Sequence, residues 1–75
     1  MDDMTNRARD LLADALELAP EEIADDASID TVGAWTSFGH MRLILALEQA
    51  LGHELDPASI VEIASLKDIE SLLRP

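Results

Sequence analysis

The sequence GAWTSFGHM occupies residues 33–41 and marks the change from a polar loop to a strongly apolar helix. Ser37 stands at this change, where the first turn of the helix is expected. Free N–H groups and the positive end of the helix dipole face such a position, which favours a phosphate-linked group. Thr36 is the expected N-cap, because its side chain can satisfy these N–H groups and leave the Ser37 hydroxyl free. The plainer alternative is that Ser37 only starts the helix, since serine is common there.

The helix after this stretch is predicted over residues 37–51, with Gly52 ending it. Its middle is apolar without a break, which is typical of a helix buried on more than one side. The stripe expected in the core consists of Leu43, Ile44, Leu47 and Leu51. Met41 and Leu45 point more to the side, next to Phe38. Either these two residues also join the core, or they are exposed and form a surface that binds a partner.

Three further helices are expected around this one. The first begins near Asp3 or Thr5 and ends near Leu18 or Ala19, and Pro20 stops it or begins a short turn. A short helix follows Asp56-Pro57 and continues to about Glu62, and the last one begins at a capping-box-like Ser65-Leu66-Lys67-Asp68 and ends by Arg74-Pro75. The long connection over residues 19–36 has three spaced apolar anchors, which are Ile23, Ile29 and Val32. We therefore predict a small all-α four-helix bundle with three main helices, one short helix and a long structured loop between the first two main helices.

Length and composition indicate one small domain over residues 1–75. A hydrophobic content of 48% argues against disorder. Trp35 and Phe38 are the two aromatic residues, so the core is expected to consist of Leu, Ile, Val and Ala. The chain has no cysteine, which excludes disulfides and thiolate metal sites. No N-terminal apolar run resembles a signal peptide and no segment could span a membrane, so we expect a cytoplasmic location. We also expect a monomer.

The formal net charge is −11, and it is distributed unevenly. Residues 1–30 hold ten acids against two arginines, whereas residues 37–51 balance Glu48 against Arg42. An acidic chain repels nucleic acid and favours basic protein partners, although the charge can also serve only solubility.

Conventional enzyme chemistry finds little support in these residues. His40 and His53 lie at opposite ends of the predicted second helix, so we expect no shared metal site. The loop acids Asp25, Asp26 and Asp30 lack the spacing of a calcium loop and are expected to be solvated. Ser37 and His40 are three residues apart and can approach each other on a helix, but no third catalytic group is indicated. We therefore predict no catalytic residues.

The whole chain resembles the acyl carrier protein family. The resemblance rests on Thr36-Ser37-Phe38, on the apolar run from Leu43 to Glu48, on residues 50–55, on the upstream stretch 25–29 and on the tail from Ile60 to Leu73. It implies a 4′-phosphopantetheine attached to Ser37 by a phosphopantetheinyl transferase, with coenzyme A as donor. The thiol of that arm would hold acyl groups as thioesters. Implied partners are acyl ligases or transferases and condensing and tailoring enzymes, in fatty acid, polyketide or related specialised biosynthesis.

Two residues depart from the family pattern. Thr36 replaces the usual Asp, which removes a carboxylate that the transferases commonly meet, and Phe38 replaces Leu. The second helix also has few acids, with Gly39, His40 and Arg42 expected on its surface and Glu48 as its one acid. The residues expected to bind partners are Thr36, Phe38, Met41, Arg42, Leu45 and Glu48. The alternatives are a carrier-like acidic helical module that is never modified and acts in protein interactions, and a fragment of a serine hydrolase.

Overall fold

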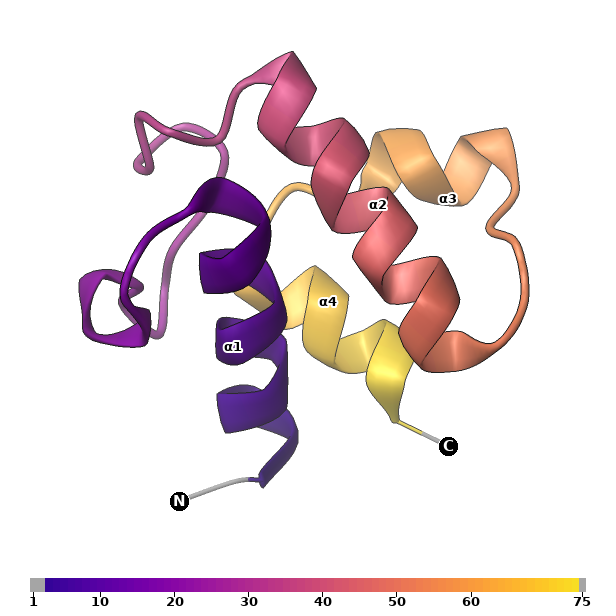
Figure 1. The fold of residues 1–75 in the computed structure, drawn as a ribbon, viewed down its shortest axis with the longest axis horizontal. Helices are drawn as coiled ribbons and strands as arrows, with labels where there is room; N and C mark the ends of the chain where they lie inside the picture. Colours follow the sequence, from indigo (N-terminus) through magenta and orange to yellow (C-terminus); the bar gives the residue numbers. More distant parts are fainter. Residues whose placement is uncertain (1–2, 75) are drawn as a thin grey trace.

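The computed structural model describes residues 3–74, which form four α-helices and one short 3₁₀ helix (Figure 1). The helices are α1 (Asp3–Leu16), η1 (Pro20–Glu22), α2 (Ser37–Leu51), α3 (Pro57–Glu62) and α4 (Leu66–Leu73). The predicted all-α bundle of three main helices and one short helix is confirmed. Pro75, where the last helix was expected to end, lies outside the described residues.

The other two main helices, α2 and α4, both pack against α1. Figure 1 shows α3 on the far side of α2 from α1. Helix α3 therefore stands at the edge of the bundle, outside the packing of α1 against α2 and α4.

The helix starts follow the predicted caps. The Thr36 side chain accepts a hydrogen bond from the Gly39 N–H at 3.2 Å. The Asp56 carboxylate accepts from Ser59 N–H at 2.7 Å, and the Ser65 hydroxyl accepts from Asp68 N–H at 3.2 Å. Each cap satisfies an N–H group that has no partner within its helix. At the other end of α2, Gly52 adopts the left-handed conformation with φ 79°, as the sequence predicts.

The end of α1 differs from the prediction. The helix stops at Leu16, two or three residues early, because Glu17 adopts a left-handed conformation with φ 59°. The Glu17 N–H then donates to the Asp14 carbonyl at 3.3 Å and the Leu18 N–H to the Ala13 carbonyl at 2.8 Å. This is a Schellman ending without the usual glycine. Pro20 opens η1, which confirms the expected short turn.

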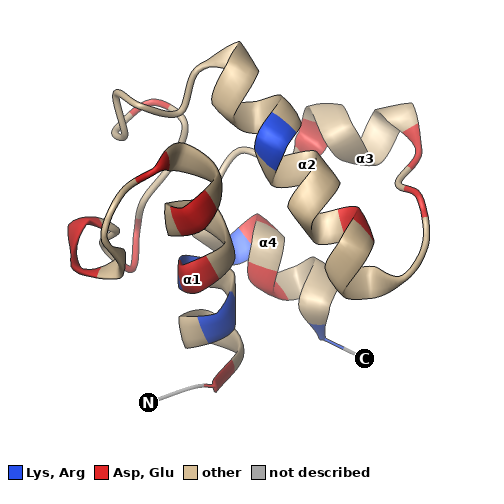
Figure 2. Cartoon of the chain, in the orientation of Figure 1, with Lys and Arg blue, Asp and Glu red and all other residues tan. Residues whose placement is uncertain are grey.

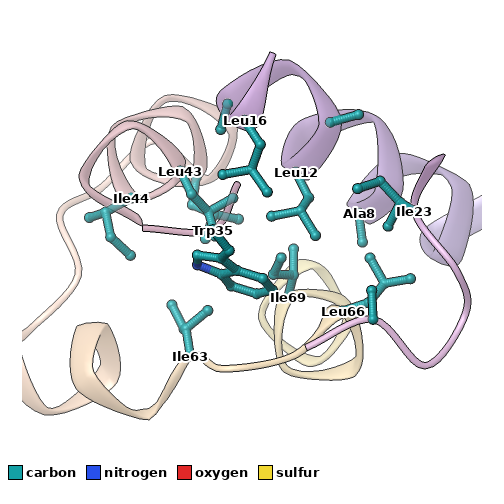
Figure 3. Close-up of a cluster of buried hydrophobic side chains, with 14 residues drawn as sticks. Ala8, Leu12, Leu16, Ile23, Trp35, Leu43, Ile44, Ile63, Leu66 and Ile69 are labelled. Atoms are coloured by element: carbon teal, nitrogen blue, oxygen red, sulfur yellow. The ribbon is translucent and has the colours of Figure 1, made fainter. Parts of the chain in front are cut away.

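The core has an aromatic residue at its centre, contrary to the prediction of a purely aliphatic core. Trp35 is only 3% exposed, and Figure 3 places its indole between side chains of all three main helices. The other buried side chains are aliphatic, and they are Ala8, Leu12, Ala13, Ala15, Leu16, Ile23, Ala27, Leu43, Ile44, Leu47, Ile63, Leu66 and Ile69. Leu51, which was expected in the core, is half-buried.

The connection over residues 19–36 lies against the bundle, but its anchors differ from those expected. Ile23 is buried and Val32 is half-buried, whereas Ile29 is 40% exposed. Ala27 and Trp35 supply the remaining buried contacts. Ile29 N–H donates to the Ala64 carbonyl at 2.8 Å, which attaches the loop to the segment between α3 and α4. The loop therefore reaches Ser37 along a fixed path.

Candidate functional site

Ser37 is the first residue of α2 and is exposed. Its hydroxyl makes no hydrogen bond to any of residues 3–74. The neighbouring Thr36 side chain serves as the N-cap, as the sequence predicts, so the Ser37 hydroxyl is not needed for that role. The remaining free N–H groups of the first turn and the helix dipole favour negative charge at this position. An accessible hydroxyl in this setting is suited to carry a phosphoryl group.

Trp35 and His40 fix the chain on both sides of Ser37. The Trp35 indole N–H donates to His40 Nδ1 at 2.9 Å, and the two rings lie nearly parallel with centroids 6.1 Å apart. His40 Nε2 lies 2.9 Å from the Ile60 carbonyl oxygen. Because Nδ1 accepts from Trp35, Nε2 carries the proton and donates to Ile60. The imidazole thus bridges the loop end, α2 and α3.

This arrangement of His40 bears on the hydrolase alternative. A general base needs a ring nitrogen within reach of the serine hydroxyl. Both nitrogens of His40 are directed elsewhere, toward Trp35 and Ile60. The approach of Ser37 and His40 that their spacing allows therefore does not produce a Ser–His pair.

Gly39 lies where Leu16 of α1 and Ala34 of the loop approach α2 closely. A Cβ at this position would lie 2.6 Å from Leu16 Cδ2 and 3.1 Å from the Ala34 carbonyl oxygen. Gly39 is buried and His40 is half-buried, so the expectation that both occupy the outer surface of α2 is wrong. The close approach of Leu16 and Ala34 and the hydrogen bonds of His40 turn these residues inward.

The outer surface of α2 is apolar near its start. Phe38, Met41 and Leu45 are 73%, 67% and 62% exposed, and they recur at helical spacing on one side of α2. We call these three residues the apolar rim. Of the two possibilities that the sequence left open for Met41 and Leu45, the exposed one holds. Exposed apolar side chains at adjacent positions are typical of a binding surface.

A groove with a volume of about 490 Å³ lies beside Ser37, between α2 and α3. Ser37, His40 and Met41 line one wall. The other residues that line it are Ile29, Ile60, Val61, Ile63 and Ala64. The walls are mostly apolar, and Ser37 and His40 are the polar side chains that line them. Sequence analysis did not identify the α3 residues of this groove, because nothing local to α3 indicates that it faces Ser37.

The charged residues of α2 are both engaged within the chain. Arg42 forms an ion pair with Glu17 at 2.9 Å, and Glu48 accepts a hydrogen bond from the Leu55 N–H at 2.9 Å. Figure 2 shows that the acidic residues gather mainly on α1 and the loop after it, whereas the start of α2 is uncharged. The surface around Ser37 is therefore less acidic than the net charge of −11 would lead one to expect.

No three His, Asp or Glu side chains within residues 3–74 gather closely enough to hold a metal ion. Asp25, one of the loop acids, forms an ion pair with Arg9, whose guanidinium also donates to the Ile23 carbonyl at 3.0 Å. In the same range, no helix is both long enough and apolar enough to cross a lipid bilayer.

The chain is similar to a known protein family. A family model described as "Phosphopantetheine attachment site" matches residues 6–73, which is nearly the whole chain. No curated protein matches the chain.

Proposed function

We propose that Ser37 carries the prosthetic group of this chain, which belongs to the phosphopantetheine attachment site family over residues 6–73. Proteins of this family hold 4′-phosphopantetheine covalently and act as carriers. The observation that supports Ser37 is its exposed hydroxyl at the start of α2, with no hydrogen bond to residues 3–74. Thr36 caps the helix in its place.

In the attachment step, the Ser37 oxygen forms a bond to the phosphorus of coenzyme A that bears the pantetheine. The pyrophosphate bond breaks, the adenosine bisphosphate leaves, and the hydroxyl proton passes to a base of the transferase. The chain's own contribution is positional. The N–H groups and dipole at the start of α2 stabilise the negative phosphodiester that results. When bound, the arm supplies a thiol that holds acyl groups as thioesters.

The groove beside Ser37 supports a role in sheltering the acyl chain. It is mostly apolar, Ser37 is one of its lining residues, and its volume of about 490 Å³ is in the range of small-molecule sites. Burial of an aliphatic chain there contributes roughly 25 cal/mol for each Å² of apolar surface removed from water. We infer that the cargo is an acyl intermediate of fatty acid, polyketide or related specialised biosynthesis. We also infer that the protein acts as a cytoplasmic monomer without catalysis of its own.

We infer that partner enzymes recognise this protein through the apolar rim. A transferase, acyl ligase, condensing enzyme or tailoring enzyme must reach Ser37, and the rim of Phe38, Met41 and Leu45 adjoins it. Arg42 and Glu48 are paired within the chain, so fewer free charges remain there. Binding is therefore expected to depend more on apolar contact than on charge. A salt series with a cognate enzyme tests this, since a steep loss of affinity with added salt would overturn it.

The decisive experiment for the attachment site is the intact mass of the protein after incubation with coenzyme A, Mg²⁺ and a broad-specificity phosphopantetheinyl transferase. We expect the parent to gain one phosphopantetheine and one titratable thiol, and Ser37→Ala to gain neither. Ser71→Ala is the matched control, because Ser71 is also exposed and helical but lies on α4. A mass gain that persists in Ser37→Ala would refute the assignment.

A Thr36→Asp variant shows how to interpret an experiment in which the parent gains no phosphopantetheine. If the parent gains no mass, Thr36→Asp restores the carboxylate that such transferases commonly meet while keeping an N-cap side chain. Modification of Thr36→Asp alone would indicate a dedicated transferase for the natural protein. No modification of either form, together with an unmodified mass for protein purified from its native cell, would favour the alternative of an acidic interaction module.

A further inference from the structure

Helix α3 is the most weakly packed helix among the described residues. It contains no fully buried residue, whereas each of the other α-helices contributes at least two to the core. Ile60 is half-buried against that core, and its neighbour Val61 is 81% exposed. Ile63, at the C-cap of α3, is buried, so apolar burial holds the end of this helix more firmly than its body. Hydrogen bonds therefore contribute to keeping the body of α3 beside α2.

Three hydrogen bonds fasten α3 and its flanking residues to α2 and to the loop before α2. They are Leu55 N–H to the Glu48 carboxylate at 2.9 Å, His40 Nε2 to the Ile60 carbonyl at 2.9 Å, and Ile29 N–H to the Ala64 carbonyl at 2.8 Å. The first and the last attach the segments before and after the helix. The bond from His40 is the one of the three that reaches the helix itself, at its middle.

The backbone around Ile60 leaves its carbonyl dependent on His40. In a longer helix this carbonyl would accept from the N–H four residues later. That N–H belongs to Ala64, and it donates to the Asp68 carboxylate at 2.9 Å instead. His40 in turn is oriented by the buried indole of Trp35, which fixes the tautomer that can donate.

The bond from His40 also joins two residues that line the groove beside Ser37. His40 and Ile60 both line that groove, from α2 and α3 respectively. We propose that His40 is a positioning residue that latches α3 to α2, so that the groove beside Ser37 widens when the bond between His40 and Ile60 opens. The biological meaning of the latch rests on the proposed function, in which the groove receives the acyl chain that Ser37 carries.

Two substitutions of similar polarity distinguish an effect on the bond between His40 and Ile60 from an effect on the stability of the whole fold. In His40→Asn, the short amide can still accept from Trp35 but cannot reach Ile60. In His40→Gln, the longer amide can still donate to Ile60. His53 is exposed, and its Nδ1 lies 2.9 Å from the carbonyl oxygen of the adjacent Glu54. Because this contact does not involve α3, His53→Asn is the matched control.

The readouts use the full, unmodified chain. We expect His40→Asn to raise the hydrogen-exchange rates of amides 60–63 about five- to tenfold, the effect of losing one hydrogen bond. The same variant should bind the uncharged apolar dye N-phenyl-1-naphthylamine several times more tightly. His40→Gln should remain close to the parent in both measurements, and His53→Asn should match the parent.

Several results would overturn the latch. Unchanged exchange in His40→Asn would mean that the bond does not hold α3, and faster exchange without tighter dye binding would mean that His40 only caps a carbonyl. The parent gives a test that needs no variant, because amides 60–63 must exchange by local opening, faster than those of α1, α2 and α4. Exchange of α3 only by global unfolding would refute the latch. None of these readouts requires modification of Ser37, so failure of the latch and failure of the attachment site are separate results.

Discussion

Trp35 and Phe38 both stand within two residues of Ser37, but they are expected to differ greatly in what they contribute to stability. Trp35 is 3% exposed and donates to His40, whereas Phe38 is 73% exposed. Trp35→Ala removes a large buried side chain and leaves a cavity, which costs about 3–5 kcal/mol. Domains of this size have a free energy of unfolding of roughly 4–11 kcal/mol in total. Phe38→Ala, in contrast, is expected to stay within about 0.5 kcal/mol of the parent.

The assay is urea unfolding followed by far-ultraviolet circular dichroism, because Trp35 is the one tryptophan and its replacement removes the fluorescence signal. If Trp35→Ala fails to fold, Trp35→Phe gives a measurable intermediate case. Phe keeps much of the apolar volume but removes the donor to His40, which costs about 1–3 kcal/mol for the unsatisfied imidazole nitrogen. The reasoning would be refuted if Trp35→Phe were as stable as the parent, or if Phe38→Ala were as destabilised as Trp35→Ala.

Three further predictions concern the rest of the fold. Glu17→Gly should be more stable than Glu17→Ala by about 1 kcal/mol, because both lose the Arg42 ion pair but only glycine adopts φ 59° without strain; equal melting temperatures would contradict this. The Ser59 N–H holds the pKa of Asp56 below its ordinary value, so the cap of α3 contributes stability above that ordinary value and loses it as the pH falls through the lowered pKa. The stability deficit of Asp56→Asn relative to the parent should therefore shrink on acidification below about pH 4, and a deficit that stays constant would count against the cap. Finally, the net charge of −11 predicts a melting temperature that rises with salt, which a flat salt series would disprove.

The parts of the fold that were predictable from sequence are those decided locally. Thr36, Asp56 and Ser65 each cap the helix that follows, and a cap depends only on a side chain and the next few N–H groups. The same holds for Ser37, whose place at the start of α2 follows from the polar-to-apolar change alone. Local chemistry therefore located the candidate attachment residue before any tertiary contact was known.

The features that sequence analysis missed depend on distant contacts. Nothing near Trp35 distinguishes it from Phe38, and its burial is decided by the path of the loop across α1, α2 and α4. The early end of α1 could not be predicted, because Glu17 adopts a left-handed conformation that is usual for glycine. Pro20 is a strong helix-stop signal, so the predicted helix continued to the residues just before it. The wall that α3 gives to the groove could not be inferred either, since its residues follow Ser37 by more than twenty positions.

Under the proposed function, Ser37 lies between a firmly packed and a less firmly packed part of the chain, and a carrier benefits from both. On one side, Gly39 lets Leu16 and Ala34 approach the first turn of α2 closely, which fixes the position of Ser37. On the other side, the body of α3 contributes no fully buried residue, and a helix with little buried surface opens at lower cost than a buried core. If Ser37 is the attachment site and the groove receives acyl chains, as proposed, a rigid start of α2 lets different enzymes find the same serine, and a yielding α3 lets the groove fit different acyl chains. If the chain were firmly packed on both sides of Ser37, the serine would be held rigidly, but the groove could not adapt.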